Sequence, residues 1–153
     1  MFWFDKKDKR VLFEDNRNEI RIVDVGTAGT KGRAPRVTEP NILTSFANMP
    51  YPDESFWHIV FDPPHLRRDR DTGIFTANYG VLNKQTWKDD LQSGFAECFR
   101  VLKTNGTLIF KWNEIDIPLK EILALTPVKP LYGHRSGKKA QTHWVSFIKE
   151  ATA

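Results

Sequence analysis

The sequence predicts one α/β domain whose sheet is mostly parallel and ends in an antiparallel strand. Two observations lead to this class. The clearest helical pattern lies between two apolar strand candidates, residues 56–61 and 107–112, and a helical crossover is the connection that parallel strands need. The last strand candidates, residues 128–131 and 143–149, flank a basic, glycine-bounded loop instead of a helix, which indicates an antiparallel pair.

The composition restricts the class of protein. A length of 153 residues fits a single domain, residues 1–153, that is long enough to bury a core. The hydrophobic share of 40% and the charged share of 27% are typical of soluble globular proteins, and no apolar run approaches the roughly 20 residues that a membrane helix needs. The apolar start, Met1 to Phe4, gives way at once to charged residues, unlike a signal peptide. We therefore expect a cytoplasmic protein without a membrane partner.

Charge and cysteine content narrow the chemistry. The net charge of +4 favours a polyanionic partner such as DNA or RNA, although it does not require one. Cys98 is the one cysteine of the sequence, which excludes an intramolecular disulfide and a cysteine-based zinc site. The four histidines show no metal-ligand spacing, so no metal is expected. Nothing in the sequence indicates the oligomeric state.

Short strands are predicted in the amino-terminal third. Residues 11–13 are an apolar run followed by the polar residues 14–16, as in a buried strand that delivers polar groups at its carboxyl end. Residues 19–25 alternate, residues 36–39 are a suitable partner, and the segment 26–36 between them is rich in glycine. This segment is either a hairpin turn or a glycine-rich cofactor loop. We favour the hairpin, because about ten residues leave no room for the helix that a cofactor loop introduces.

The central part of the chain contains the clearest elements. Residues 41–44 predict a short strand and residues 56–61 a strongly apolar one, whereas the polar residues 66–86 predict a flexible loop beside the active site. Thr86 is a suitable N-cap for the helix that follows, and Asp89 occupies the reciprocal capping position.

The predicted helix has a clear apolar face and a clear end. Its apolar stripe consists of Leu91, Phe95, Cys98, Phe99 and Leu102. Cys98 on this stripe is expected to be a core thiol. Asn105-Gly106 predicts the end of the helix, and residues 118–123 predict a second, short helix.

The tetrapeptide Asp62-Pro63-Pro64-His65 directly follows the strand candidate 56–61. Ligands of open α/β sheets bind outside the carboxyl ends of the strands, so the tetrapeptide lies where a site is expected. Two successive prolines fix φ and donate no N–H, which makes the backbone rigid and presents carbonyl acceptors. A carboxylate beside rigid carbonyls is suited to holding both hydrogens of an exocyclic amino group while its lone pair attacks a methyl group.

Such help is needed because the amino lone pair of adenine, cytosine or guanine is delocalised into the ring. Hydrogen bonds to Asp62 and to the Pro63 carbonyl would favour the pyramidal geometry that attack requires, and His65 is placed to stack on the base. The alternative is purely structural: a strand end followed by a proline turn.

Asp62-Pro63-Pro64-His65 resembles the [Asp/Asn]-Pro-Pro-[Tyr/Phe/Trp/His] motif of class I S-adenosylmethionine-dependent methyltransferases that act on planar amino groups. Residues 48–56 are similar to the segment between the third and fourth strands of that fold, and residues 95–110 resemble its helix, glycine turn and fifth strand. The resemblance covers residues 42–149. It implies a Rossmann-like class I methyltransferase fold, truncated at the amino terminus, and methyl transfer from S-adenosyl-L-methionine to an amino nitrogen.

The resemblance also implies which residues bind the cofactor. The family's second strand ends in an acidic residue that takes the ribose hydroxyls; this corresponds to Asp15, with Asn16 beside it and Asp5 as a further candidate. Ser45, Phe46 and Ala47 fall where the family contacts the adenine ring. The alternative for the acidic residues is a solvated turn.

Four further residues are candidates for substrate binding. Arg67 and Arg68 follow the motif and can hold phosphates, although charges beside a loop are often only solvated. Lys111 and Asn113 end the strand after the helix, beside the expected site. The substrate expected is a nucleobase in DNA or RNA. Two alternatives stay open: a non-catalytic subunit that binds nucleic acid or a partner enzyme, and an enzyme that methylates a small molecule or a protein amine.

Overall fold

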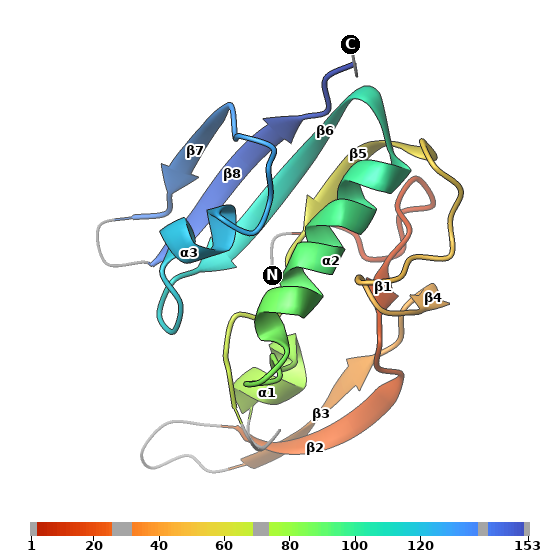
Figure 1. The fold of residues 1–153 in the computed structure, drawn as a ribbon. Coiled ribbons are helices and arrows are strands. Elements are labelled where there is room, and N and C mark those ends of the chain that lie inside the picture. Colours follow the sequence, from red (N-terminus) through yellow and green to blue (C-terminus); the bar gives the residue numbers. More distant parts are fainter. Residues whose placement is uncertain (1–2, 26–31, 69–73, 138–140, 152–153) are drawn as a thin grey trace.

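The computed structural model describes residues 3–25, 32–68, 74–137 and 141–151, and it shows a mixed α/β protein (Figure 1). Its largest sheet has four strands in the order β5-β6-β8-β7. The bounds are β5 (Phe56–Phe61), β6 (Leu102–Asn113), β7 (Tyr132–Arg135) and β8 (Thr142–Ile148). β5 and β6 are parallel, and β8 is antiparallel to β6 and to β7. The antiparallel end that the sequence predicts is confirmed.

The other strands form two small sheets. β1 (Glu14–Asp15) pairs in parallel with β4 (Ile42–Leu43), and β2 (Glu19–Val25) pairs antiparallel with β3 (Gly32–Thr38). In the described part of the chain two strand pairings are thus parallel and three antiparallel. The prediction of a mostly parallel sheet is therefore wrong. Parallel strands need long crossover connections. β2 and β3, and likewise β7 and β8, follow each other in the chain without a crossover and therefore pair antiparallel.

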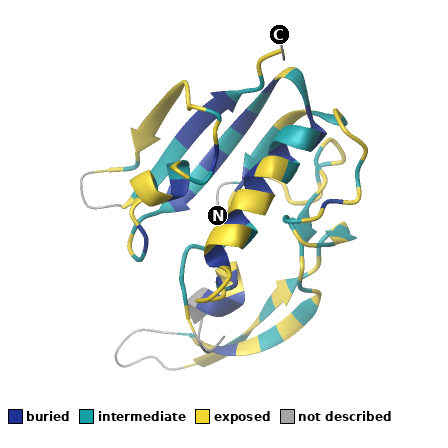
Figure 2. Cartoon of the chain, in the orientation of Figure 1, coloured by how far each residue is buried: buried dark blue, intermediate teal, exposed yellow. Residues whose placement is uncertain are grey.

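The connection between β5 and β6 carries the two helices α1 (Ile74–Tyr79) and α2 (Trp87–Val101), and α3 (Leu119–Leu123) follows β6. Helix α2 lies across the four-stranded sheet and turns its buried side toward it (Figure 2). Phe95 is central to this contact, because its ring centroid lies 5.0 Å from that of Phe110 and 5.5 Å from that of Phe61. Cys98 is fully buried, as predicted, and burial raises the pKa of its thiol.

The start of α2 differs from the prediction. The side chain of Thr86 does not cap the helix; its hydroxyl donates a hydrogen bond to Asp90 Oδ2 at 2.7 Å. Asn83 Oδ1 instead accepts the backbone N–H groups of Gln85 and Thr86, at 2.8 and 3.2 Å. The Asn83 carboxamide therefore caps the turn that precedes the helix, whereas Thr86 is the N-cap position of α2 without a capping side-chain bond.

Three other boundaries also differ. Helix α1 lies within residues 66–86, which the sequence predicted as a flexible loop. The partner of β8 is β7 rather than residues 128–131, because Val128 packs against the core before the strand begins. Asn105 adopts the left-handed conformation (φ 63°) that its sequence suggested, but it lies within β6, since the chain passes from α2 into β6 at Leu102 without a loop.

The glycine-rich segment joins two antiparallel strands. β2 and β3 pair from Glu19 with Thr38 to Val25 with Gly32. This is the arrangement that the hairpin interpretation requires, with a partner strand longer than the residues 36–39 predicted. Gly26 and Gly29 themselves lie outside the described residues.

Arg100 ties the end of α2 to the segment before β5. Its guanidinium donates to the carbonyls of Met49 (3.1 Å) and Tyr51 (2.8 Å), and it pairs with Asp53 and Glu97 at 2.7 Å each. Glu97 in turn accepts the Met49 N–H at 2.7 Å. These bonds hold the segment that leads into β5 against the end of α2.

Trp112→Phe is expected to lower the free energy of unfolding by about 1–2 kcal/mol, because the buried Ile117 carbonyl would lose its hydrogen bond. The Trp112 indole N–H donates to that carbonyl at 2.9 Å, and the side chain is 1% exposed. Urea unfolding followed by circular dichroism measures the loss. Trp57→Phe is the control, because Trp57 is 64% exposed and its loss should cost less than about 0.5 kcal/mol. Equal losses of unfolding free energy in the two variants would contradict a stabilising role for the hydrogen bond of Trp112.

Candidate active site

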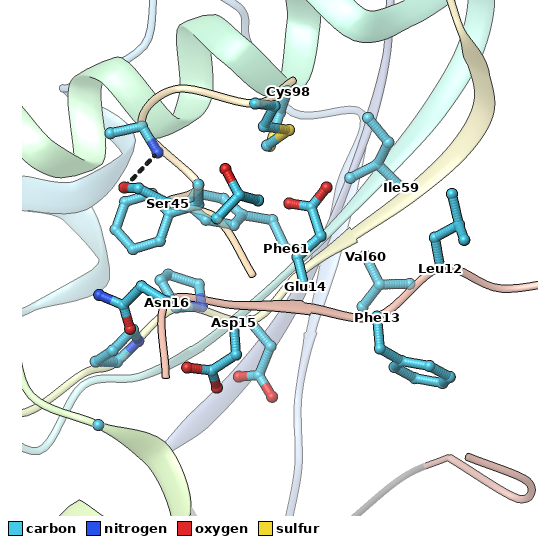
Figure 3. Close-up of a pocket in the computed structure, with 18 of the residues that line it drawn as sticks. Leu12, Phe13, Glu14, Asp15, Asn16, Ser45, Ile59, Val60, Phe61 and Cys98 are labelled. Atoms are coloured by element: carbon cyan, nitrogen blue, oxygen red, sulfur yellow. Dashed lines mark hydrogen bonds between the residues drawn. The ribbon is translucent and has the colours of Figure 1, made fainter. Parts of the chain in front are cut away.

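A cavity of about 1170 Å³ lies between β5 and the amino-terminal segment (Figure 3). Its walls include residues 9–17, 44–47, 58–64 and 79–83. Of the residues predicted to bind the cofactor, Asp15, Asn16, Ser45, Phe46 and Ala47 line it, and so do Asp62, Pro63 and Pro64 of the motif. The structure thus brings together two sets of residues that are far apart in the sequence.

Asp62 leaves β5 at the rim of this cavity and is held by Lys111. The Lys111 ammonium donates to Asp62 Oδ2 at 2.8 Å, and the two side chains are 20% and 28% exposed. Lys111 reaches Asp62 because β6 lies beside β5, with Phe61 paired to Phe110. The sequence suggested Lys111 as a substrate contact, whereas in the structure it contacts the candidate catalytic carboxylate. One carboxylate oxygen is thereby fixed by a charged donor.

The rest of the motif is packed from both sides. Pro63 is buried, and Pro64 lies so close to Gly80 that a Cβ on that glycine would come within 3.2 Å of Pro64 Cγ. The His65 ring lies 5.9 Å from the Tyr79 ring and 6.4 Å from the Trp112 ring. The prolines and His65 are therefore held in place by α1 and β6, and His65 lies behind the cavity lining rather than in it.

Burial lowers the pKa of His65 below its ordinary value of 6.5. Asp62 and Asp116 act in the opposite direction and raise it, whereas Lys111 and Arg68 lower it further. His65 is therefore neutral at neutral pH.

The shift predicts how stability changes with pH. A histidine whose pKa is lower in the folded state stabilises the fold fully above its unfolded pKa and loses this contribution as the pH falls below about 6.5. We therefore expect the free energy of unfolding of the wild type to fall more between about pH 7 and pH 5 than that of His65→Phe. Urea titrations at both pH values measure the difference. If the wild type loses no more stability than His65→Phe between these pH values, the lowered pKa of His65 is contradicted.

Asp15 is the best-positioned acidic residue on the opposite wall, but both of its oxygens are engaged. Arg17 donates to Oδ1 at 2.9 Å and to Oδ2 at 2.8 Å, and its guanidinium also reaches the carbonyls of Thr76 and Ala77 at 3.2 Å. Asn16 beside it is exposed. Asp15 is thus held rigidly at the end of β1, and a ribose would have to share it with Arg17 or displace Arg17.

The segment Ser45–Ala47 forms a tight turn at the cavity wall. Ser45 Oγ accepts the Ala47 N–H at 3.2 Å, which is the dashed line in Figure 3. The Phe46 ring packs on Phe61 with centroids 5.4 Å apart. Asp5, in contrast, is exposed, binds the Lys7 N–H at 2.8 Å and does not line the cavity. The turn is therefore joined to the strand that carries the motif, whereas Asp5 is not part of the site.

Glu14 is a cavity residue that the sequence analysis did not single out. Figure 3 shows its carboxyl group on the side of the cavity where Cys98 lies, opposite to the side chain of Asp15. Burial raises the pKa of Glu14, while the Tyr51 hydroxyl lowers it. Its position was recognisable in principle, since neighbouring residues of a strand point to opposite faces.

The remaining substrate candidates have structural partners. Arg67 binds Asp116 through its backbone N–H at 2.7 Å and its guanidinium at 3.3 Å, and it lies 5.5 Å from the centre of the Trp87 ring. Asn113 donates to the Thr142 hydroxyl at 3.0 Å. Arg68 is 51% exposed; its guanidinium donates to the Arg67 carbonyl at 3.0 Å and lies 3.9 Å from Asp116 Oδ2. Arg68 is therefore the most accessible of these predicted contacts.

Within the described residues, no group of three or more His, Cys, Asp and Glu side chains is placed to hold a metal ion. None of the helices described is long and apolar enough to span a membrane. No protein-family model matches the chain, and no curated protein matches it significantly.

Proposed function

We propose that the protein is an S-adenosyl-L-methionine-dependent methyltransferase that acts on an amino nitrogen, with a nucleobase in DNA or RNA as the preferred substrate. One observation carries the proposal: Asp62-Pro63-Pro64 follows β5 and borders the same cavity as Asp15 and the Ser45–Ala47 turn. Its volume of about 1170 Å³ exceeds the range of roughly 300–1,000 Å³ typical of small-molecule sites, so it has room for a nucleoside cofactor and an amino group.

The residues present suit the two halves of this reaction. Bound S-adenosylmethionine supplies an electrophilic methyl group. Asp62 accepts a hydrogen bond from the attacking amine through the oxygen that Lys111 leaves free, and the rigid proline backbone limits the positions that the amine can take. Lys111 keeps the carboxylate oriented while the nitrogen acquires positive charge.

Calorimetric titration with S-adenosylmethionine tests the cofactor half of the proposal. The wild type should bind, and Asp15→Asn should bind at least about tenfold more weakly, because a charged acceptor contributes about 1.5–3 kcal/mol. Asp8→Asn is the matched control, since Asp8 also pairs with an arginine two residues later but does not itself line the cavity. No binding of the wild type at millimolar cofactor would overturn the proposal.

The engagement of Asp15 by Arg17 favours a second candidate, a non-catalytic subunit that keeps the site without using the cofactor. Incubation with labelled cofactor and, separately, with DNA, RNA and cell extract distinguishes the candidates. Label in DNA or RNA supports the proposal. Label only in proteins or small molecules of the extract would show that the substrate is not a nucleobase. No label in any fraction would favour the non-catalytic subunit.

A further inference from the structure

Strand β5 has the sequence of a central strand but the position of an edge strand. In the described sheet its one neighbour is β6. Exposed edges in natural proteins are protected by charged residues or proline, whereas strands buried in parallel sheets are continuously apolar. Phe56–Phe61 contains no Lys, Arg, Asp, Glu or Pro, and five of its six residues are apolar. The free edge of β5 therefore lacks the usual protection against pairing.

The facing wall of the cavity is also a strand with a free edge. The Phe13 carbonyl accepts the N–H groups of Asn41 and Ile42, and the Asp15 carbonyl accepts that of Thr44. Peptide groups of successive strand residues point to opposite edges. Those of Leu12 and Glu14, which line the cavity, consequently point away from β4 and toward β5.

The two strands run in the same direction. Their carboxyl ends meet at Gly80, where a Cβ would lie 3.2 Å from Pro64 Cγ and 3.6 Å from Arg17 Cζ. Their amino ends lie near Tyr51, whose ring is 4.8 Å from that of Phe56 and which lines the cavity together with Glu14. The cavity thus separates two parallel strands, each with an unused edge facing it.

We propose that this groove binds one extended polypeptide segment with apolar side chains on both faces, which pairs in parallel with β5 on one side and with residues 12–14 on the other. Main-chain hydrogen bonds would hold it, as in other cases of strand addition. The added strand would join the β1-β4 pair to the four-stranded sheet. It would occupy the amino-terminal part of the cavity, between Leu12 and Ile59, and leave the end near Asp15 and Asp62 accessible.

A strand tethered to the full chain tests the proposal. Trp3 lines the cavity and lies 5.0 Å from the Phe13 ring, so an extension of the amino terminus begins next to the groove. The probe is an extension of about five Val, Ile and Leu residues followed by a Gly/Ser linker of about eight residues, which is long enough to return along the strand. The control extension has proline at alternate positions of the apolar segment, where it cannot donate to a strand.

The apolar extension should raise the Tm by at least about 5 °C and slow hydrogen exchange of the amides of residues 58–61 by at least about tenfold, whereas the proline extension should do neither. Equal effects of the two extensions would overturn the proposal. The unextended chain gives a second measurement: full protection of every β5 amide in the monomer would also overturn it. Protection that appears only with dimers in sedimentation would assign the groove to a second copy instead. All samples lack S-adenosylmethionine, so failure of the methyltransferase proposal leaves this result unaffected.

Discussion

Asp62→Ala is expected to lower the kcat of methyl transfer by about 10²–10³-fold while cofactor affinity stays within about threefold of the wild type. The reason is that Asp62 borders the cavity at the motif and has one oxygen held by Lys111, so it is the acceptor best placed for the amine. Transfer of labelled methyl groups to DNA or RNA measures the first quantity, and calorimetry the second.

The variant should remain folded, because a partly exposed ion pair contributes less than about 1 kcal/mol. Asp53→Ala is a matched control, since Asp53 also pairs with a basic residue but lies outside the cavity, and it should retain full turnover. Lys111→Met should fall between the two, with kcat reduced about tenfold, because the Asp62 carboxyl group remains but loses the group that orients it. Full turnover of Asp62→Ala would refute its role.

Gly94→Ala is expected to lower the free energy of unfolding by about 2 kcal/mol, although alanine in an open helix position would raise it by about 1 kcal/mol. A Cβ at Gly94 would lie 2.7 Å from Phe46 Cδ2 and 2.8 Å from Phe61 Cζ, closer than carbon atoms approach. Both rings belong to the cavity wall, so moving them should also weaken cofactor binding. Urea unfolding and calorimetric titration measure the two effects.

Close packing around Gly94 and the helix propensity of alanine change the free energy of unfolding in opposite directions, so the measured sign shows which effect is larger. Ser93→Ala is the control on the same helix, because Ser93 is exposed and the substitution should not destabilise the protein. If Gly94→Ala were as stable as the wild type, the close packing of α2 on Phe46 and Phe61 would be contradicted.

The elements that the sequence predicted well are those whose signal is local. The apolar run 56–61 coincides with β5, and the periodic stripe lies on α2 except for Leu102, which begins β6. Thr86 is the N-cap position of α2, as predicted, but its side chain makes no capping bond, because Asn83, an equally good capping residue three positions earlier, binds the turn before the helix. Helix α1 was missed because its six residues are too short to show a period.

In the candidate site, too, features encoded by neighbouring residues were predicted, whereas contacts between distant residues were not. The position of Asp62 after a strand was readable from the sequence, and the structure places it on the cavity together with Asp15. Its pairing with Lys111 was not readable, and neither was the pairing of Arg67 with Asp116, since each joins residues from different elements. Charged residues near a motif are thus easy to assign to a substrate when their partners lie far along the chain.

Those pairings also bear on how the protein folds. Lys111 with Asp62, Arg67 with Asp116 and Arg100 with Tyr51 each join residues that are 49 positions apart. Closing a loop of this length has a large entropic cost, but the cost is met once, because the first contact brings the other partners together. High contact order slows folding, so these bonds should form together and late, as one cooperative step. The candidate catalytic carboxylate would then acquire its lysine partner in the same step that docks α2 onto β5 and β6.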